Sequence, residues 1–247
     1  MVIDEQMNEH SRFDLREPAE ETIIWKYLDL AKYLALLKTR QLHLAPATEF
    51  WDKYEGDIAR AQKKSLLEKY GQDQYESLVQ SFDKLRERTY VSCWTENEFE
   101  SDAMWRIYTG ASYGVAIEST YGRLRALLPR ANREQQRGLA QFCGSINYID
   151  FKSEILEQDC YKLAYFFKRK SFEHEREGRV VVHDMRGDQA EGPRKIQLTQ
   201  AQIDSLIVKV HLSPGAPSWF KDLVYEVNKD YGLDREPIPS ALDEAPE

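Results

Sequence analysis

The chain has 247 residues, of which 42% are hydrophobic and 31% are charged, and its formal net charge is −8. Five tryptophans, 14 tyrosines and 10 phenylalanines can supply a sizeable core, which excludes a globally disordered protein. No apolar run approaches the roughly 20 residues that a membrane-spanning helix needs. The N-terminal stretch also lacks the apolar segment of a secretory signal. We therefore expect a cytoplasmic globular protein that does not use a membrane.

The negative charge is concentrated at the two ends of the chain. Residues 1–20 and residues 234–247 each carry a net charge of −4, and residues 21–233 are neutral. We expect a flexible acidic arm over 1–20, a single domain over 21–233 and an acidic C-terminal tail over 234–247. A neutral domain does not favour a broad nucleic-acid surface, although it is compatible with a local basic groove.

Cysteine and histidine spacing argues against metal and disulfide chemistry. The three cysteines, Cys93, Cys143 and Cys160, form no C-x-x-C pair, and the five histidines show no ligand spacing. We expect neither a disulfide framework nor a metal site. The phosphate-binding, dinucleotide-binding and hydrolase motifs with glycine at fixed spacing are also missing from the sequence.

Hydrophobic periodicity predicts helices and strands that are interspersed along the chain. In the first third of the chain we expect a strand over 22–27, a helix over 30–37, a strand over 42–44 and two helices within 57–88 that are broken near Gly71. The middle should form a strand over 89–94, a helix over 101–108, a strand over 113–117, a helix over 121–128, a strand over 145–149 and a long helix over 151–169. The remainder should form a strand over 179–183, a polar turn over 187–194, a strand over 206–212 and a helix over 217–230. Because no regular strand–helix–strand rhythm appears, the predicted class is α+β. The two helices within 57–88 are predicted as a helical insertion.

The most distinctive stretch runs from Lys168 to Arg179. If a strand begins near His174, its alternation places Glu175, Glu177 and Arg179 on one face. Carboxylates at alternate strand positions lie about 7 Å apart and repel each other unless a cation lies between them. Arg179 or a cationic part of a substrate could supply that charge. The alternative is a solvated ladder of charges that pairs with the next strand.

A second candidate combines a strand end with an aromatic helix. Ser92 lies on the strand TYVSCW and Thr95 follows it, and the alternation of the strand points these two side chains in opposite directions. Trp105 and Tyr108 share one face of the following helix. This arrangement could form the wall of a pocket for a flat ligand. The alternative is ordinary core packing.

Two further groups are secondary candidates. Asp52 and Glu55 lie among aromatic residues and could position a base or bind a cation, or could simply cap a loop. Lys170 belongs to a basic cluster at the end of the predicted long helix. That cluster could bind a phosphate, or could interact with the helix dipole.

Taken in order, these stretches resemble an uncharacterised bacterial family catalogued as domain of unknown function 2971. The resemblance covers roughly residues 22–242 and rests on Trp25–Tyr27, Phe50–Gly56, Val91–Trp94, Met104–Tyr108, Gly114–Ile117, Ser171–Arg179, Leu212–Pro214 and Ser240. The chain departs from the family pattern at Trp51, Lys53 and Gly178. No activity is established for the family, and its resemblance to abortive-infection proteins implies a role in phage defence or stress response.

The order of the candidates also has a distant similarity to the ADP-ribosyltransferase fold, in which a split sheet holds NAD. The similarity implies that Lys26 and Tyr27 lie on the first strand of the split, Ser92 and Thr95 on the second, and Glu175-Arg176-Glu177 on a later strand. It further implies that Glu177 is catalytic and that Tyr27 and Ser92 contact the cofactor. Lys26 stands where a histidine or arginine is usual.

These observations predict a pocket that binds a small molecule or a nucleotide. Its expected residues are Tyr27, Ser92, Trp105, Tyr108, Glu175, Glu177 and Arg179. The leading hypothesis is an NAD-dependent ADP-ribosyltransferase-like enzyme. One alternative is a non-catalytic module that binds a ligand or a partner. Another is a nucleic-acid-acting enzyme that uses Asp52, Glu55 and the basic cluster. The sequence predicts no oligomeric state.

Overall fold

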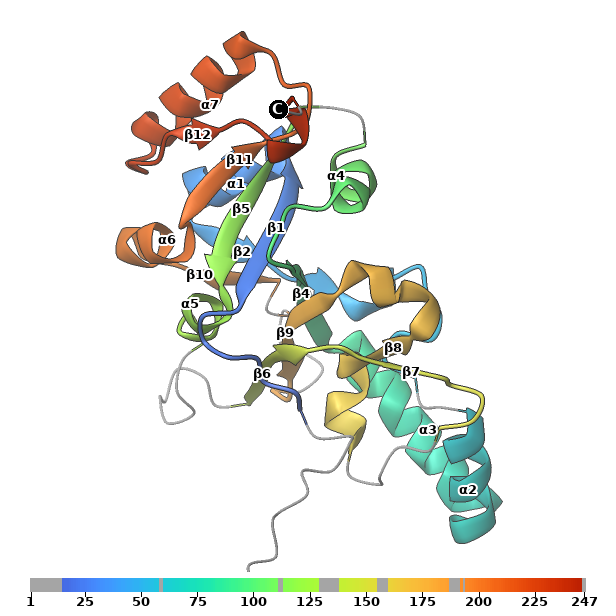
Figure 1. Ribbon diagram of the computed structural model, residues 1–247. Helices are drawn as coiled ribbons and strands as arrows, with labels where there is room; N and C mark the ends of the chain where they lie inside the picture. Colours follow the sequence, from blue (N-terminus) through green and yellow to red (C-terminus); the bar gives the residue numbers. More distant parts are fainter. Residues whose placement is uncertain are drawn as a thin grey trace, which may run out of the picture.

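The computed structural model describes residues 15–57, 60–110, 113–128, 138–154, 160–186, 192 and 194–245. Its main sheet contains β1 (Ile23–Asp29), β3 (Ala45–Pro46), β4 (Thr89–Glu96), β5 (Gly114–Thr120), β6 (Leu139–Ser145), β9 (Glu177–Asp184), β11 (Lys209–Leu212) and β12 (Pro237–Ile238). The strand order is β12-β11-β5-β1-β4-β9-β6, and β3 pairs beside β4 (Figure 1). Neighbouring strands are antiparallel except β11 and β12, which are parallel. This mixed sheet confirms the predicted α+β class.

Shorter elements surround the main sheet. Two small sheets pair β2 (Gln41–His43) with β10 (Lys195–Gln197) and β7 (Asn147–Ile149) with β8 (Phe167–Arg169). The α-helices are α1 (Leu30–Thr39), α2 (Arg60–Tyr70), α3 (Gln72–Glu87), α4 (Asp102–Thr109), α5 (Tyr121–Arg125), α6 (Gln200–Leu206) and α7 (Ser218–Asp230). The 3-10 helices include η1 (Ala47–Glu49), η3 (Cys160–Phe166), η4 (Lys170–Glu175) and η5 (Ala241–Asp243).

Both faces of the sheet are covered, and every residue of β9 is buried. One face, which we call the helical face, carries Ile24 and Val180 and packs against α1, α5, α6 and α7 in the largest apolar cluster. The opposite face, which we call the site face, carries Trp25 and Val181 and packs against α4 and η3 in smaller clusters. Successive residues of a strand therefore enter different cores.

The sheet splits between β1 and β4. β1 pairs with β5 along its whole length, but it pairs with β4 only at Ile24 and Trp25. Beyond that point the Lys26 amine spans the gap and donates to the carbonyl of Cys93 at 3.0 Å. The side chain of Lys26 thus satisfies a carbonyl that the interrupted ladder leaves without a backbone donor. The split confirms the predicted arrangement of the sheet.

Local sequence signals explain several helix boundaries. The N-cap hydroxyl of Ser101 accepts a hydrogen bond from Met104 N at the start of α4, as the sequence predicts. Gly71, with a φ of 77°, separates α2 from α3. These two helices form the predicted insertion, which extends away from the main sheet at the lower right of Figure 1.

The predicted helix over 151–169 is wrong for the described residues. Residues 151–153 form a turn, 160–166 form the 3-10 helix η3, and 167–169 form β8. Ala164, Tyr165, Phe166 and Phe167 are all buried, so this stretch has no polar face for an amphipathic helix. The predicted strand over 206–212 is shorter than expected, because residue 206 ends α6. The predicted turn over 187–194 lies mostly outside the described residues.

Both ends of the described chain contact the sheet. Arg16 forms a bridge with Ser145, so the part of the predicted arm from residue 15 onward packs against β6, whereas residues 1–14 lie outside the described residues. At the other end β12 pairs with β11, and the Ser240 hydroxyl donates to Glu100 at 2.7 Å. The segment that contains β12 and Ser240 therefore contacts the domain. None of the helices formed by the described residues has the length and apolar character needed to cross a membrane.

Candidate functional site

The candidate site is a buried cluster of five charged side chains on the site face of β9. The cluster, called the ion cluster below, consists of Glu55, Lys168, Glu175, Glu177 and Arg179. Its members come from the loop after η1, from β8, from the end of η4 and from the start of β9. The alternation of β9 places Glu177 and Arg179 on the same face, as the sequence predicts.

Arg179 lies at the centre of this cluster and is fully buried. Its Nε donates to Glu177 Oε2 at 2.7 Å, and its Nη2 contacts the same carboxylate. Glu55 accepts from Nη1 and Nη2 with its two oxygens, at 2.7 and 3.1 Å. The carbonyl of Tyr165 accepts a further hydrogen bond from Nη1 at 2.9 Å. Such complete pairing is what a guanidinium needs to remain buried in its charged form.

Lys168 connects the two glutamates of β9 and η4. Its Nζ donates to Glu175 Oε2 at 2.7 Å and lies 3.2 Å from Glu55 Oε1 and 3.6 Å from Glu177 Oε1. With three carboxylates and two cations, the cluster carries a formal charge of −1. The carboxylates therefore form neither the solvated ladder nor a pair bridged by Arg179 alone. Lys168 was not among the predicted site residues, because its position on β8 depends on pairing with β7.

The two carboxyl groups have pKa values that are displaced in opposite directions. Burial, and then the charge of Glu177, raise the pKa of the Glu175 carboxyl above its usual range. Burial alone would also raise the pKa of Glu177, but Arg179 and Lys168 outweigh it and hold that pKa below its usual range. Neighbouring carboxyl groups with separated pKa values are a common basis for dividing acid and base roles.

The backbone at Arg176 joins Glu175 to Glu177. Glu175 does not belong to the strand, since η4 ends there and Arg176 adopts a left-handed conformation with a φ of 45°. This conformation is unusual for a residue other than glycine, and it reverses the chain between the two glutamates. Gly178 faces the other side of β9, where an added Cβ would lie 2.8 Å from Glu96 Oε1 and would displace the end of that side chain.

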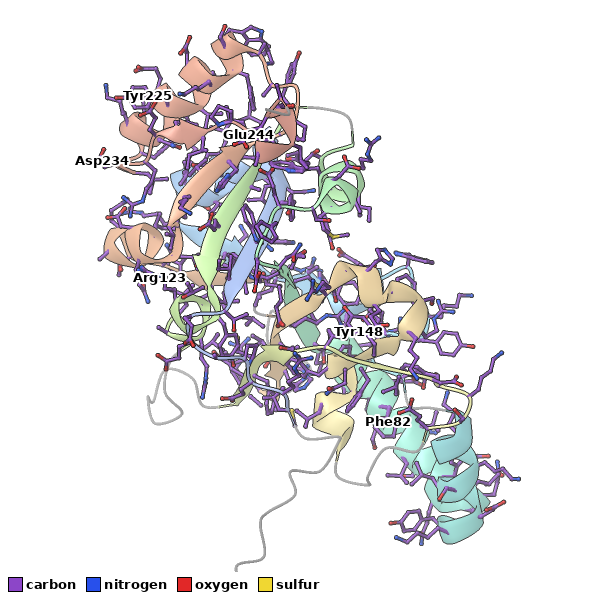
Figure 2. All side chains as sticks on the ribbon, in the orientation of Figure 1. Phe82, Arg123, Tyr148, Tyr225, Asp234 and Glu244 are labelled. Carbon is purple, nitrogen blue, oxygen red and sulfur yellow. The ribbon has the colours of Figure 1, made fainter. Side chains whose placement is uncertain are left out.

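Aromatic side chains border the ion cluster. The backbone N–H of Glu177 donates to the hydroxyl of Tyr148 at 2.8 Å. Figure 2 labels Tyr148 near the centre of the molecule. Tyr108 on α4 is 39% exposed. Burial of its hydroxyl, and then the charges of Cys93, Glu177 and Glu175, raise the pKa of Tyr108. Tyr148 was not predicted from the sequence.

The structure brings only some of the predicted residues together. Thr95 is opposite Glu177 on the neighbouring strand and faces the same side. Ser92 faces the helical side, because it lies an odd number of residues from Thr95, and there its hydroxyl accepts from Lys26 Nζ at 3.2 Å. Lys26 and Ser92 are therefore paired at the split, but on the opposite side of the sheet from Glu177.

The predicted aromatic residues on β1 and α4 pack into a separate cluster. Tyr27 and Trp105 are in edge-to-face contact at 5.0 Å, and both are buried. The Tyr27 hydroxyl accepts from Ser101 N at 2.8 Å, and Trp105 Nε1 donates to Glu100 at 2.8 Å. The core-packing alternative applies to these two residues.

The secondary candidates are ion-paired. Asp52 is buried and accepts from Arg169 at 2.9 and 3.3 Å, while Glu55 belongs to the ion cluster. Lys170 lies 3.5 Å from Glu154, and more than half of its side chain is exposed. The described residues contain no group of three or more histidine, cysteine, aspartate or glutamate side chains arranged to hold a metal ion.

Comparison with known proteins does not assign the chain to a family. No family model matches it, and no curated protein matches it, so the resemblance to the family of unknown function 2971 is not confirmed. Among solved structures, it is similar to Thermus sp. 2.9 DarT in complex with ADP-ribosylated single-stranded DNA. The two chains are 10% identical with a TM-score of 0.40, over 92% of this chain and 97% of that chain. At this identity and TM-score the similarity carries no conclusion about activity.

Proposed function

We propose that the chain is an NAD-dependent ADP-ribosyltransferase-like enzyme whose site is the ion cluster beside the split of the sheet. The observation that carries the proposal is a pair of neighbouring glutamates in which Glu177 is buried against Arg179 and Lys168, whereas Glu175 is partly exposed and contacts Lys168. Their pKa values are displaced in opposite directions. Negative charge fixed by buried cations is suited to stabilising positive charge that develops on a ribose. A carboxyl with a raised pKa is suited to accepting a proton.

Exposure assigns different roles to the two glutamates. Only 4% of the Glu177 side chain is exposed, and its oxygens contact Arg179 and Lys168. The Glu175 side chain is 14% exposed. Glu175 is therefore the carboxylate that can accept a hydrogen bond from a ribose hydroxyl. Glu177 influences Glu175 through its charge and through their shared contact with Lys168. The proposal therefore gives the substrate contact to Glu175, whereas the sequence predicts Glu177 as the catalytic residue.

The proposed transfer needs no group beyond the substrate and an acceptor. The C1′–N bond to nicotinamide breaks, and its electron pair leaves with nicotinamide. Glu175 and Glu177 stabilise the positive charge that remains on the ribose. A nucleophilic oxygen or nitrogen of the acceptor then forms a bond to C1′, and Glu175 takes the proton that this nucleophile loses. Tyr108 supplies an aromatic ring at the edge of the site.

The test is nicotinamide release from NAD by the wild type and by Glu175→Gln. The variant keeps the shape of the side chain and removes its charge, so we expect release to fall about 10²–10³-fold while NAD binding is largely kept. Glu173→Gln is the matched control, because Glu173 is exposed in the same 3-10 helix. The proposal would be contradicted if the wild type released no nicotinamide, with or without cell lysate as acceptor, and if millimolar NAD caused no thermal shift.

A non-catalytic binding module is the second candidate function. It is favoured by the burial of Arg179 and by the pairing of that side chain with Glu55 and Glu177, which is also what a purely structural cluster would show. In that case neither wild type nor Glu175→Gln would turn over NAD. The role in phage defence or stress response implied by the family resemblance remains a prediction for either function.

A further inference from the structure

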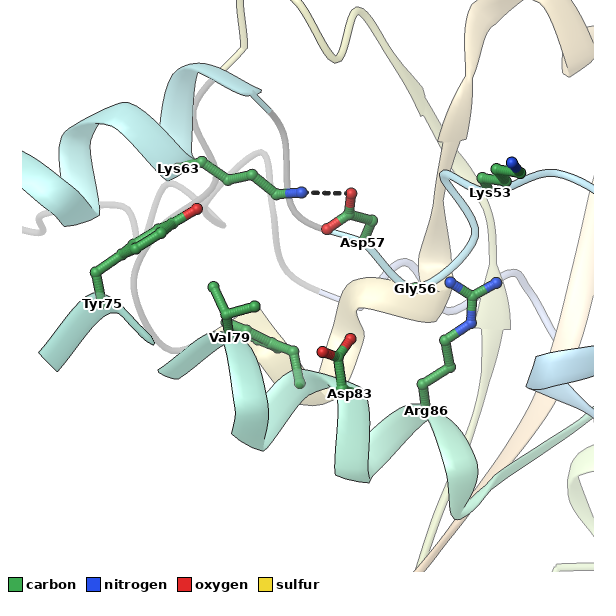
Figure 3. A pocket seen from close by; sticks show the side chains of 9 residues that line it. Lys53, Gly56, Asp57, Lys63, Tyr75, Val79, Asp83 and Arg86 are labelled. Atoms are coloured by element: carbon green, nitrogen blue, oxygen red, sulfur yellow. Dashed lines mark hydrogen bonds and ion pairs between the residues drawn. The ribbon is translucent and has the colours of Figure 1, made fainter. Parts of the chain in front are cut away.

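A cavity of about 170 Å³ lies between α3 and the loop that precedes α2 (Figure 3). The loop contributes Lys53 and Gly56, and α3 contributes Val79, Phe82, Asp83 and Arg86. The same loop turns Asp52 toward Arg169 and Glu55 toward Arg179. One side of the loop therefore contributes Glu55 to the ion cluster, and the other side lines this cavity with Lys53 and Gly56.

The charges around the cavity are only partly paired. Asp57 and Lys63 form an ion pair of 2.6 Å at one end. In the described part of the chain, no carboxylate pairs with Arg86, although its side chain is partly buried. Figure 3 shows the Arg86 guanidinium directed toward the loop at Gly56. The Arg86 guanidinium is therefore a cation at the cavity that can pair with a carboxylate from outside the chain.

A carboxylate also faces the cavity. Asp83 lies one helical turn before Arg86 on α3, and this exposed carboxylate has no cationic partner among the described residues. Between and beside these two groups, Val79 and Phe82 present apolar surface. Of the other cations in the lining, Lys63 is paired with Asp57 and Lys53 is exposed, so Arg86 and Asp83 present opposite charges to a ligand. A small zwitterion with an apolar side chain would match both charges and the apolar wall.

The size of the cavity separates it from the proposed NAD site. Pockets for drug-sized ligands occupy roughly 300–1,000 Å³, and a cavity of about 170 Å³ is too small for a dinucleotide. We propose that this cavity binds a free α-amino acid with an apolar side chain. Arg86 contacts the carboxylate of the ligand, Asp83 contacts its ammonium group, and Val79 and Phe82 pack against its side chain.

The position of the cavity links it to the ion cluster through one peptide. Gly56 follows Glu55 directly, and it adopts a φ of 72°. A Cβ at Gly56 would lie 2.3 Å from the ring of Tyr165, so the loop is confined between that ring and the cavity. A ligand that fills the cavity therefore restricts the segment that holds Glu55. The binding itself does not depend on the proposed enzymatic function.

The test uses thermal shift and calorimetry on the full chain with each of the twenty amino acids and with inorganic phosphate. We expect leucine, isoleucine, valine, methionine or phenylalanine to raise the melting temperature at millimolar concentration. Leucinamide lacks the carboxylate and N-acetyl-leucine lacks the ammonium group, so each should bind at least tenfold more weakly than leucine. No shift with any amino acid, or a shift with phosphate alone, would overturn the proposal.

Two variants assign the contacts. Arg86→Gln and Asp83→Asn should each raise the dissociation constant for the bound amino acid at least tenfold. Lys84→Gln is the matched control, because Lys84 is exposed on α3 between them and does not line the cavity. Circular dichroism and the melting temperature without ligand show whether each variant folds. Equal affinity in folded Arg86→Gln, Asp83→Asn and wild type would also overturn the proposal.

Discussion

Lys26 occupies the split of the sheet, but its side chain lies with Ser92 on the opposite side of the sheet from Glu177. The resemblance to the ADP-ribosyltransferase fold implies that Lys26, Ser92 and Glu177 lie on three strands at a split, and the corresponding strands β1, β4 and β9 are neighbours in the sheet. The faces of those strands were not predictable to the same degree. A motif gives the order of residues, but the register of β4 against β9 decides that Thr95, and not Ser92, faces the same side as Glu177.

Burial lowers the pKa of the Lys26 amine from 10.5 to about 8. In the unfolded chain this pKa keeps its ordinary value, so between about pH 8 and 10.5 the unfolded state binds more protons than the folded state. The contribution of Lys26 to the free energy of unfolding therefore rises with pH in that window. Below about pH 8 the amine is charged in both states, and the cost of burying the charge is fully present.

We expect the wild type to gain about 1 kcal/mol of stability relative to Lys26→Met between pH 7 and pH 9. The measurement is the difference in urea unfolding free energy between the two proteins at each pH. Comparison with Lys26→Met is needed because Cys93, which both proteins contain, makes stability fall with pH. Burial raises the pKa of its thiol from 9.0 to about 12. A difference that stays constant between the two pH values would contradict the lowered pKa of Lys26.

At the scale of elements, the segment from residue 151 to Glu175 contains structure that local sequence periodicity does not predict. Apolar residues at helical spacing predict one helix, but β8 forms in this segment by parallel pairing with β7. A strand pair of this kind depends on contacts that local periodicity does not contain. By contrast, α1, α4 and α7 were predictable because each has an apolar stripe and a polar face. Glu175 was placed on a strand for the same local reason, although η4 carries it.

The junction between α6 and β11 is held from the C-terminal segment by Arg235. Its guanidinium donates to the carbonyls of Asp204, Ile207 and Val208, each at 3.1 Å. Carbonyls at the end of a helix lack intrahelical partners, so Arg235→Ala leaves them unpaired. We expect a loss of about 1.5–3 kcal/mol, or a fall in melting temperature of roughly 3–12 °C.

Lys221→Ala is the control for Arg235→Ala. Lys221 forms an ion pair of 3.0 Å with Glu236, whose side chain is 72% exposed. An exposed pair of this kind contributes about 0–1 kcal/mol. Equal stability of Arg235→Ala and Lys221→Ala would show that the segment after residue 233 is only loosely attached, as its composition alone suggests.

For the whole molecule, the decisive feature is a sheet that is covered on both faces. The largest apolar cluster lies on the helical face. The site face carries a smaller apolar cluster together with the ion cluster. The continuous apolar run of residues 180–182 on β9 is consistent with a central strand between two cores. Composition could predict that the chain has enough apolar surface for a core, but not that the core is divided by the sheet.

Val180 and Val181 test this division, because they are adjacent, fully buried and on opposite faces of β9. Val180→Ala leaves a cavity in the helical face, and Val181→Ala leaves one in the site face. Each should lower the free energy of unfolding by about 2 kcal/mol, measured by urea denaturation. Leu223→Ala is the control, since Leu223 is 41% exposed on α7 and should cost much less. If Val181→Ala behaved like Leu223→Ala, the site face would be open to solvent, and the ion cluster could not be the desolvated group on which the proposed chemistry depends.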